Sequence, residues 1–245
     1  MQGPPDRGPL AGVRVLEVAQ WWFVPAAGAV LADWGADVVK IEHPVRGDAQ
    51  RGLAAAGFRM AVAGVDFMMQ QSNRCKRSVG LDIGVPEGRA LLLRLAAESD
   101  VFLTNLSTKA LEKWECGYEL LAKKNPRLIY AMGSGYGPYG RITKPSFDLT
   151  VQALTGIMSR LGEPGQPPIY LGMGSGDAMG GMMAAFAIML ALYARQHTGR
   201  GQFLDQVGRD VAGEVGPGAL DPCLRQHQPL HPADDDRQDA GDQAG

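Results

Sequence analysis

The chain has 245 residues, of which 45% are hydrophobic and 20% charged, and its formal net charge is -2 at pH 7. This length and composition suffice for a buried core in one or two domains. The near-neutral balance excludes the strong basic field typical of nucleic-acid binding, so we expect no nucleic-acid partner. The three cysteines, Cys75, Cys116 and Cys223, are far apart and form no C-x-x-C pair, which argues against a disulfide framework and a metal site.

Residues 1–8 are rich in Gly and Pro and contain no apolar segment of the kind found in secretory signals. They predict a disordered start and a cytoplasmic protein.

Apolar runs and helical patterns alternate through the first half of the chain. Val13–Val18 and Asp37–Ile41 are typical of strands, and Pro25–Trp34 between them is typical of a helix with proline in its opening turn. The alternation continues with a helix at 86–97, a strand at 101–104, helices near Leu111 and at 118–124, and a strand at 127–131. This predicts an α/β fold: a doubly wound, mostly parallel, Rossmann-like sheet with helices on both faces and any ligand at the carboxyl ends of the strands.

The loop after the first strand, Ala19–Pro25, contains no G-x-G-x-x-G, which weakens a dehydrogenase interpretation. Glu42 follows the second strand where dinucleotide folds place a ribose-binding acid, but without those glycines we interpret it as a solvated strand-end carboxylate. The aromatic residues 21–23 have two interpretations. They stack on an adenine or line an acyl pocket, or they pack inside the fold, which is the commoner use.

Two basic clusters follow. Asn73–Ser78 is equally consistent with a solvated face and with a loop that binds phosphate groups. For Arg195–Gln202 we favour a structural role.

A glycine-rich turn, Gly172–Gly181, leads into a long apolar stretch and carries one carboxylate, Asp177. Asp177 is either a helix cap or a reactive group to which the N–H donors of the turn bring an anionic substrate. The stretch Ala178–Ala194 has no charged side chain and falls at the lower limit for a membrane span. Its glycine pair and alanines favour a helix buried at the centre of a domain, so we expect no membrane partner.

Residues 206–245 differ in composition from the rest of the chain. They are rich in Gly, Pro, Gln and Asp and contain few large aliphatic side chains. Such a segment buries too little apolar surface to offset its ordering entropy, so we predict that it is disordered.

Several stretches together, over about residues 8–205, resemble the class III CoA-transferase family, which includes formyl-CoA transferase and carnitine CoA-transferase. They occur in the family's order: Pro9–Glu17, Leu31–Pro44, Asn73–Asp82, Asn125–Tyr130, Gly135–Gly137, Gly176–Gly181 and Arg195–Gln202. The resemblance implies that residues 9–205 belong to the large domain of such an enzyme.

The resemblance also implies an activity, the transfer of coenzyme A from an acyl-CoA thioester to a small carboxylic acid. Asp177, the Asp of the Gly-Asp motif, is then the catalytic nucleophile, and it reacts through an aspartyl acyl anhydride and an aspartyl-CoA thioester. Coenzyme A and acyl-CoA are substrates, and no permanently bound cofactor is implied. By position in the family, the CoA contacts are Trp22, Phe23, His43, Leu81, Asp82, Ile83, Gly84, Asn105, Leu106, Lys113 and Lys144. Formyl-CoA transferase has Gln in place of Trp22 and Arg in place of His43 and Lys113.

Two alternatives stay open at this point. The α-methylacyl-CoA racemases share the fold and a matching Asp, but they use a preceding His-Asp pair where this chain has Phe147-Asp148, and phenylalanine cannot carry a proton. Family members are about twice as long and form interlocked dimers, so we expect this chain to lack most of a second domain through truncation or a frameshift. A family-type homodimer is then expected of a full-length chain rather than of this one, and a non-catalytic CoA-binding or heteromeric subunit is the other alternative.

Overall fold

The computed structural model describes residues 8–55, 61–62, 65–137 and 146–207. Its centre is a six-stranded sheet in the order β5-β2-β1-β6-β7-β8, in which every neighbouring pair is parallel. The order reverses between β1 and β6, as in doubly wound sheets, and this confirms the predicted α/β fold. The strands are β1 (Arg14–Val18), β2 (Asp37–Glu42), β5 (Arg77–Gly80), β6 (Val101–Thr104), β7 (Ile129–Ser134) and β8 (Phe203–Val207).

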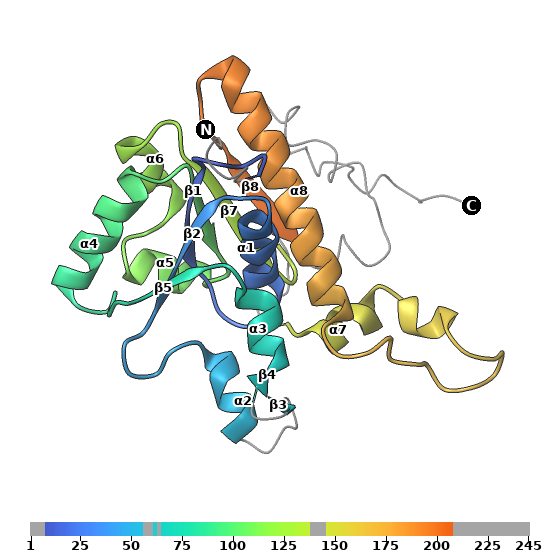
Figure 1. Cartoon of the computed structure of the whole chain (residues 1–245). Helices are drawn as coiled ribbons and strands as arrows, with labels where there is room; N and C mark the ends of the chain where they lie inside the picture. Colours follow the sequence, from blue (N-terminus) through green and yellow to red (C-terminus); the bar gives the residue numbers. More distant parts are fainter. Residues whose placement is uncertain (1–7, 56–60, 63–64, 138–145, 208–245) are drawn as a thin grey trace, which may run out of the picture.

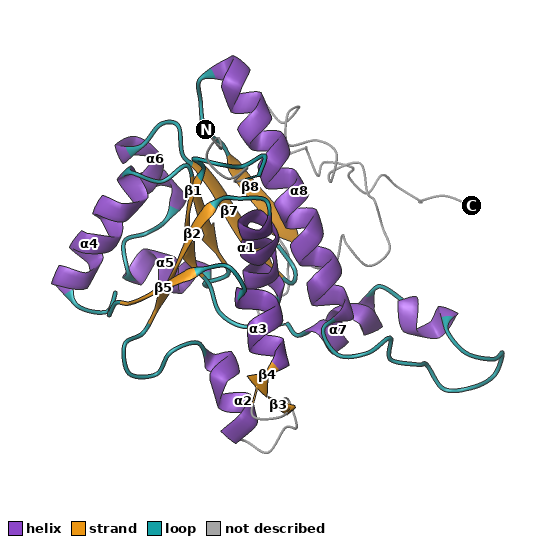
Figure 2. Cartoon of the chain, viewed as in Figure 1, coloured by secondary structure: helices purple, strands orange, loops and turns teal. Residues whose placement is uncertain are grey.

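Helices cover both faces of the sheet (Figures 1 and 2). One face carries α1 (Phe23–Asp33) and α8 (Ser175–Thr198), with α3 (Phe67–Asn73) against α1. The other carries α4 (Pro86–Ala97), α5 (Thr108–Lys113) and α6 (Tyr118–Lys124). The remaining elements are short: η1 (Ala49–Arg51), α2 (Gly52–Ala55), β3 (Ala61–Val62), β4 (Val65–Asp66), α7 (Asp148–Leu154) and η2 (Ile157–Arg160).

The side chains of the strands alternate between two apolar clusters, as the pleat of a doubly covered sheet requires. Val15 and Val101 face α1 and α8, whereas Leu16 and Phe102 face α4 and α6. Tyr130 is fully buried in the second cluster, where its hydroxyl donates to the carbonyl of Cys116 at 3.1 Å. The two clusters hold the strand ends rigidly, which positions the loops at their carboxyl edge.

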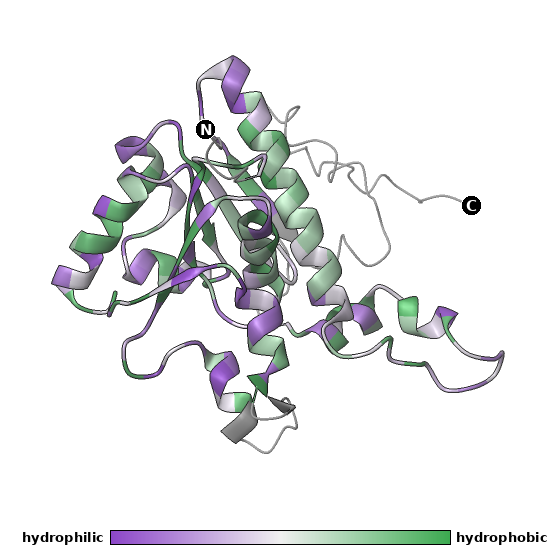
Figure 3. Ribbon diagram, in the orientation of Figure 1, coloured by the Kyte–Doolittle hydropathy of each residue, from purple (hydrophilic) through white to green (hydrophobic). Residues whose placement is uncertain are grey.

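Helix α8 has two different faces. Its small residues, including Gly180, Gly181 and Ala184, are buried against α1, whereas six large apolar side chains on the other side are 48–64% exposed. These are Met179, Met182, Met183, Phe186, Leu190 and Tyr193. The prediction of a centrally buried helix is therefore wrong for this face. Figure 3 shows α8 as a largely apolar helix on the outside of the fold. By length and composition α8 is able to cross a membrane, a test that core helices of soluble proteins also pass.

Strand β8 ends at Val207, two residues beyond the expected end of the family-like region, and the rest of the predicted disordered tail lies outside the described residues. Cys75 and Cys116 are free thiols. No group of three or more His, Cys, Asp or Glu side chains within the described ranges is arranged to hold a metal ion.

Candidate active site

A cavity of about 200 Å³ opens at the carboxyl ends of β1, β2, β5 and β6, beside the point where the strand order reverses. This is where doubly wound sheets bind their ligands. The predicted CoA contacts that line it are His43, Leu81, Asp82, Ile83, Gly84, Leu106 and Lys113. The structure thus brings together residues from three separate parts of the sequence.

His43 is held by a tight turn at the end of β2. Its Nδ1 accepts hydrogen bonds from the backbone N–H groups of Val45 and Arg46, both at 3.2 Å. Its Nε2 lies 3.8 Å from Oδ2 of Asp82 across the cavity. Because Nδ1 accepts, the neutral ring carries its proton on Nε2.

Asn105 does not line the cavity. Its amide donates to the carbonyl of Gln20 at 2.6 Å and accepts from the Gln20 N–H at 3.0 Å, so it fixes the loop after β1. The last predicted contact, Lys144, lies outside the described residues.

Trp22 and Phe23 also lie away from the cavity, and they pack beneath the glycine-rich turn. A Cβ on Gly174 would lie 2.3 Å from the Trp22 ring, and one on Gly180 would lie 2.6 Å from the Phe23 ring. Both rings therefore pack against residues of this turn in the structure. The loop after β1 reaches both places, because Gln20 lines the cavity while Trp22 supports the turn before Asp177.

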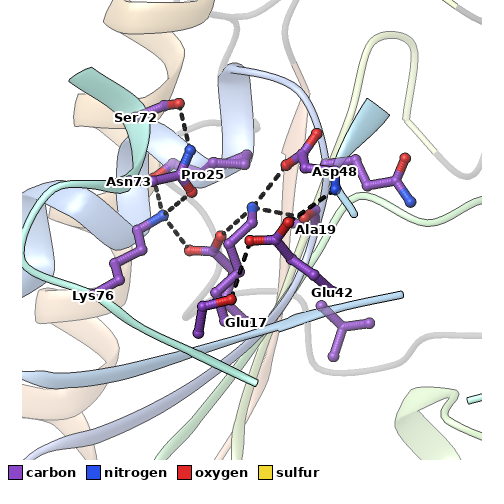
Figure 4. A network of polar contacts seen from close by, with 12 residues as sticks. Glu17, Ala19, Pro25, Glu42, Asp48, Ser72, Asn73 and Lys76 are labelled. Atoms are coloured by element: carbon purple, nitrogen blue, oxygen red, sulfur yellow. Dashed lines mark hydrogen bonds and ion pairs between the residues drawn. The ribbon is translucent and has the colours of Figure 1, made fainter. Parts of the chain in front are cut away.

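A buried ionic network lies next to the loop after β1 (Figure 4). Nζ of Lys40 lies 3.0 Å from Glu17 and 2.9 Å from Asp48, and Nζ of Lys76 lies 2.7 Å from the other oxygen of Glu17. Burial opposes the charge on Lys40, but Glu17 and Asp48 outweigh burial and raise the pKa of Lys40. For Lys76, burial prevails and lowers the pKa to about 8. Asp48 also accepts from the N–H of Trp21 at 3.0 Å, and Trp21 has a left-handed φ of 68°.

Glu42 is not the solvated carboxylate that we expected. It is buried and forms two 2.8 Å bonds with Arg51, and it accepts from the N–H of Asp48 at 2.9 Å. The hydrogen bond from Arg51 is the main reason that its pKa falls to about 2. Glu42 therefore fixes the loop at the cavity edge.

The cations of the basic cluster Asn73–Ser78 divide between the surface and the interior of the fold. Arg74 pairs with Asp33, Arg77 pairs with Asp37, and Lys76 is buried in the ionic network. Each cation has an acidic partner within the fold. Arg74 and Arg77 agree with the interpretation as a solvated face, whereas Lys76 is buried. The second cluster is structural as predicted, since Arg195 pairs with Asp100 at 2.8 Å.

Asp177 lies in the first turn of α8, after Gly174, whose φ of 76° is left-handed. A side chain at position 174 would be strained and would also strike Trp22, so glycine is required there. The Asp177 side chain is partly buried, and loss of solvent, with a smaller effect from Asp148, raises its pKa to about 7. Asp177 thus changes charge near neutral pH.

Asp148, at the start of α7, caps this turn. Its carboxylate accepts from the backbone N–H groups of Gly174 and Gly176 at 2.8 Å and of Asp177 at 3.2 Å. The helix-cap interpretation of Asp177 is therefore wrong, because the cap comes from a residue far away in the sequence. The N–H groups that we expected to face a substrate are bonded to Asp148 in this structure.

Sequence reasoning missed the roles of Asp148 and Asp48 and one cavity residue, Trp114. For Asp148 a signal existed, since it stands next to the position where racemases have histidine. Its bond to the turn could not be foreseen, because capping rules look only a few residues along the chain.

Comparison with known proteins places the chain in a family. Residues 10–211 match CoA-transferase family III. A succinyl-CoA:mesaconate CoA-transferase of Haloarcula hispanica is 39% identical over 206 residues, which are 81% of this chain and 51% of that protein. An α-methylacyl-CoA racemase of Homo sapiens is 35% identical over 198 residues, which are 80% of this chain and 47% of the racemase.

A solved structure agrees. The crystal structure of a CAIB/BAIF family protein from Brucella suis matches with a TM-score of 0.78 at 36% identity, over 85% of this chain and 55% of that one. The chain spans about half the length of these relatives. With a match over most of its length, it belongs to CoA-transferase family III.

Proposed function

We propose that the chain carries the nucleophile of a class III CoA-transferase, which moves coenzyme A from an acyl-CoA thioester to a carboxylic acid. The observation that supports this most is the placement of Asp177. A partly buried carboxyl group with a pKa near 7 lies at the start of α8, in a chain that belongs to this family.

The proposed reaction needs only carboxylates and a thiol. The Asp177 carboxylate attacks the thioester carbonyl, a C–O bond forms, the C–S bond breaks, and CoA thiolate leaves an aspartyl acyl anhydride. The thiolate then attacks the aspartyl carbonyl, which gives an aspartyl-CoA thioester and frees the donor acid. The acceptor carboxylate repeats these two steps in reverse order, so that acceptor acyl-CoA leaves and the Asp177 carboxylate is restored.

Only the ionised form of Asp177 attacks, so the first step is expected to become faster as the pH rises through 7. A raised pKa also makes a carboxylate a better nucleophile once it is ionised. Partial burial therefore lowers the fraction of ionised Asp177 and increases its reactivity at the same time.

We assign part of coenzyme A to the cavity at the strand ends. Leu81, Ile83 and Leu106 give it apolar walls, and Arg46 and Lys113 bring cations to its edge. Such a mixture suits a nucleotide, whose base needs apolar contact and whose phosphates need positive charge. The loop after β1 would then link bound CoA to the Asp177 turn through Trp22.

The test is intact-mass spectrometry of the purified chain after incubation with a panel of acyl-CoA esters and hydroxylamine. Hydroxylamine converts an activated aspartyl group to a hydroxamate, an increase of about 15 Da. We expect this increase in the wild type and its absence in Asp177→Ala. CoA binding without any adduct would overturn the catalytic proposal and favour a non-catalytic subunit.

The similarity to an α-methylacyl-CoA racemase makes isomerase activity the main alternative to test. Phe147, at the position of the racemase histidine, is exposed and packs edge-on against Trp21 with ring centroids 6.4 Å apart. It offers no group that moves a proton. Exchange of the substrate α-hydrogen with deuterium oxide, without an adduct on Asp177, would nevertheless replace the transferase proposal with an isomerase.

A further inference from the structure

Asp148 has no part in the reaction as proposed so far, yet its carboxylate is held by five donors. Three are the backbone N–H groups of the turn, including that of Asp177 itself. The other two are Nε2 of Gln152 at 2.9 Å and the hydroxyl of Tyr170 at 2.7 Å. A buried carboxylate with this many donors is fixed in one place.

We propose that Asp148 is a positioning residue for Asp177: its carboxylate clamps the backbone of the turn that carries the nucleophile and places a fixed negative charge beside it. This inference rests on the proposed function, because Asp177 must be the nucleophile for its position to matter. Both effects of Asp148, the backbone contacts and the negative charge, act on the Asp177 carboxyl group.

The clamp follows from the backbone contacts. Gly174 and Gly176 have no side chain to restrain them, so the turn depends on partners outside it. A Cβ on Gly176 would lie 2.5 Å from Asp148, so the two residues are packed closely. With Asp148 on one side and the Trp22 ring on the other, the turn is held between α7 and the loop after β1.

The charge follows from the surroundings of Asp177. Among the described residues, the titratable groups that act on it are Asp148 from α7 and Tyr170 from the loop before α8, and Tyr170 is neutral because its own pKa is raised. The elements packed on the other side contribute the apolar rings of Trp22 and Phe23. Asp148 is therefore the charge that opposes ionisation of Asp177, in the same direction as burial.

The matched variants are Asp148→Asn, which keeps the size and removes the charge, and Glu119→Gln, which removes an exposed charge on α6. The readout is the pH profile of hydroxylamine-trapped adduct formation in a single turnover. We expect the midpoint in Asp148→Asn to fall by about one pH unit, so that the rate at pH 5.5 relative to the plateau rises ~5–10-fold. The plateau itself falls because the turn is held less firmly. Glu119→Gln should leave the midpoint in place, and an unchanged midpoint in Asp148→Asn would overturn the proposal.

A second measurement does not depend on catalysis. Unfolding by denaturant is followed from pH 4 to pH 8 in the wild type, Asp177→Asn, Asp148→Asn and the double variant. We expect the pH-dependent change in stability caused by Asp177→Asn to be smaller when Asp148 is absent. A change of equal size in both backgrounds refutes the positioning role. Missing adduct together with a clear coupling would instead mean that only the proposed function fails.

If Asp148→Asn does not fold, Tyr170→Phe takes its place. This variant removes one neutral donor and retains the charge of Asp148, which is then less well compensated. In the pH series of unfolding measurements, the pH at which stability changes because of Asp177 should rise in Tyr170→Phe. An unchanged or lower value contradicts the inference.

Discussion

Two groups of buried or partly buried carboxylates differ in whether a cation balances them. Below the loop after β1, Glu17 and Asp48 are balanced by Lys40 and Lys76 at 2.7–3.0 Å. At the start of α8, neither Asp148 nor Asp177 pairs with a cation within the described part of the chain. Asp148 is satisfied by hydrogen-bond donors, whereas Asp177 retains its proton up to a pH of about 7. Paired charges stabilise the fold, whereas the Asp177 carboxyl group, without a cation, has a raised pKa, a property that is common at functional sites.

We expect the largest effect on stability from substituting Lys40. In Lys40→Met, Glu17 and Asp48 lose their shared cation in a buried place, so we expect the free energy of unfolding to fall by ~3–5 kcal/mol. Denaturant unfolding followed by circular dichroism measures the loss. Arg77→Met is the control, because its pair with Asp37 is exposed and should contribute less than ~1 kcal/mol. Similar losses in the two variants would show that burial does not distinguish these pairs.

Asp177→Asn tests the carboxyl groups at the start of α8, which have no cationic partner in the described part of the chain. Since the folded chain holds the Asp177 proton up to about pH 7 and the unfolded chain releases it near pH 4, stability from this group is lost as the pH rises between these values. Asparagine has no proton to lose. We expect the variant to be more stable than the wild type by ~2–3 kcal/mol at pH 8 and equal to it at pH 4. Parallel stability curves across this range would mean that Asp177 has an ordinary pKa.

A smaller effect is expected where α8 crosses α1. A Cβ on Gly181 would lie 2.6 Å from Cβ of Ala26 and 2.9 Å from the carbonyl oxygen of Phe23. Gly181→Ala should therefore cost ~1–2 kcal/mol despite the better helix propensity of alanine. Met182→Ala, on the exposed face of α8, should change stability by less than ~0.5 kcal/mol. If Gly181→Ala leaves stability unchanged, α1 and α8 can move apart to accept the added methyl group.

The sheet could be predicted because its central strands are rich in apolar residues, such as Val101, Phe102 and Leu103, and alternate with helices along the chain. The edge strands gave weaker signals. All four residues of β5, Arg77–Gly80, are exposed, and β8 contains Asp205 and Gln206. No local pattern distinguishes such strands from loops, because only pairing with a neighbouring strand defines them.

The candidate site divides in the same way. Asp177 and seven of the sixteen cavity residues could be named from the family resemblance. The contacts between distant residues could not, as Glu42 with Arg51 and Asp148 with Gly174 illustrate. A charged residue in a sequence does not reveal its partner, so both carboxylates acquired a meaning only in the folded chain.

The exposed apolar face of α8 has a thermodynamic consequence. The heat-capacity change of unfolding grows with the apolar surface that becomes hydrated, and side chains such as Met182 and Tyr193 are largely hydrated already. Calorimetry should therefore give a heat-capacity change below that expected for a domain of this size. The curve of stability against temperature would be correspondingly flat, and anything that covers this face would make it steeper.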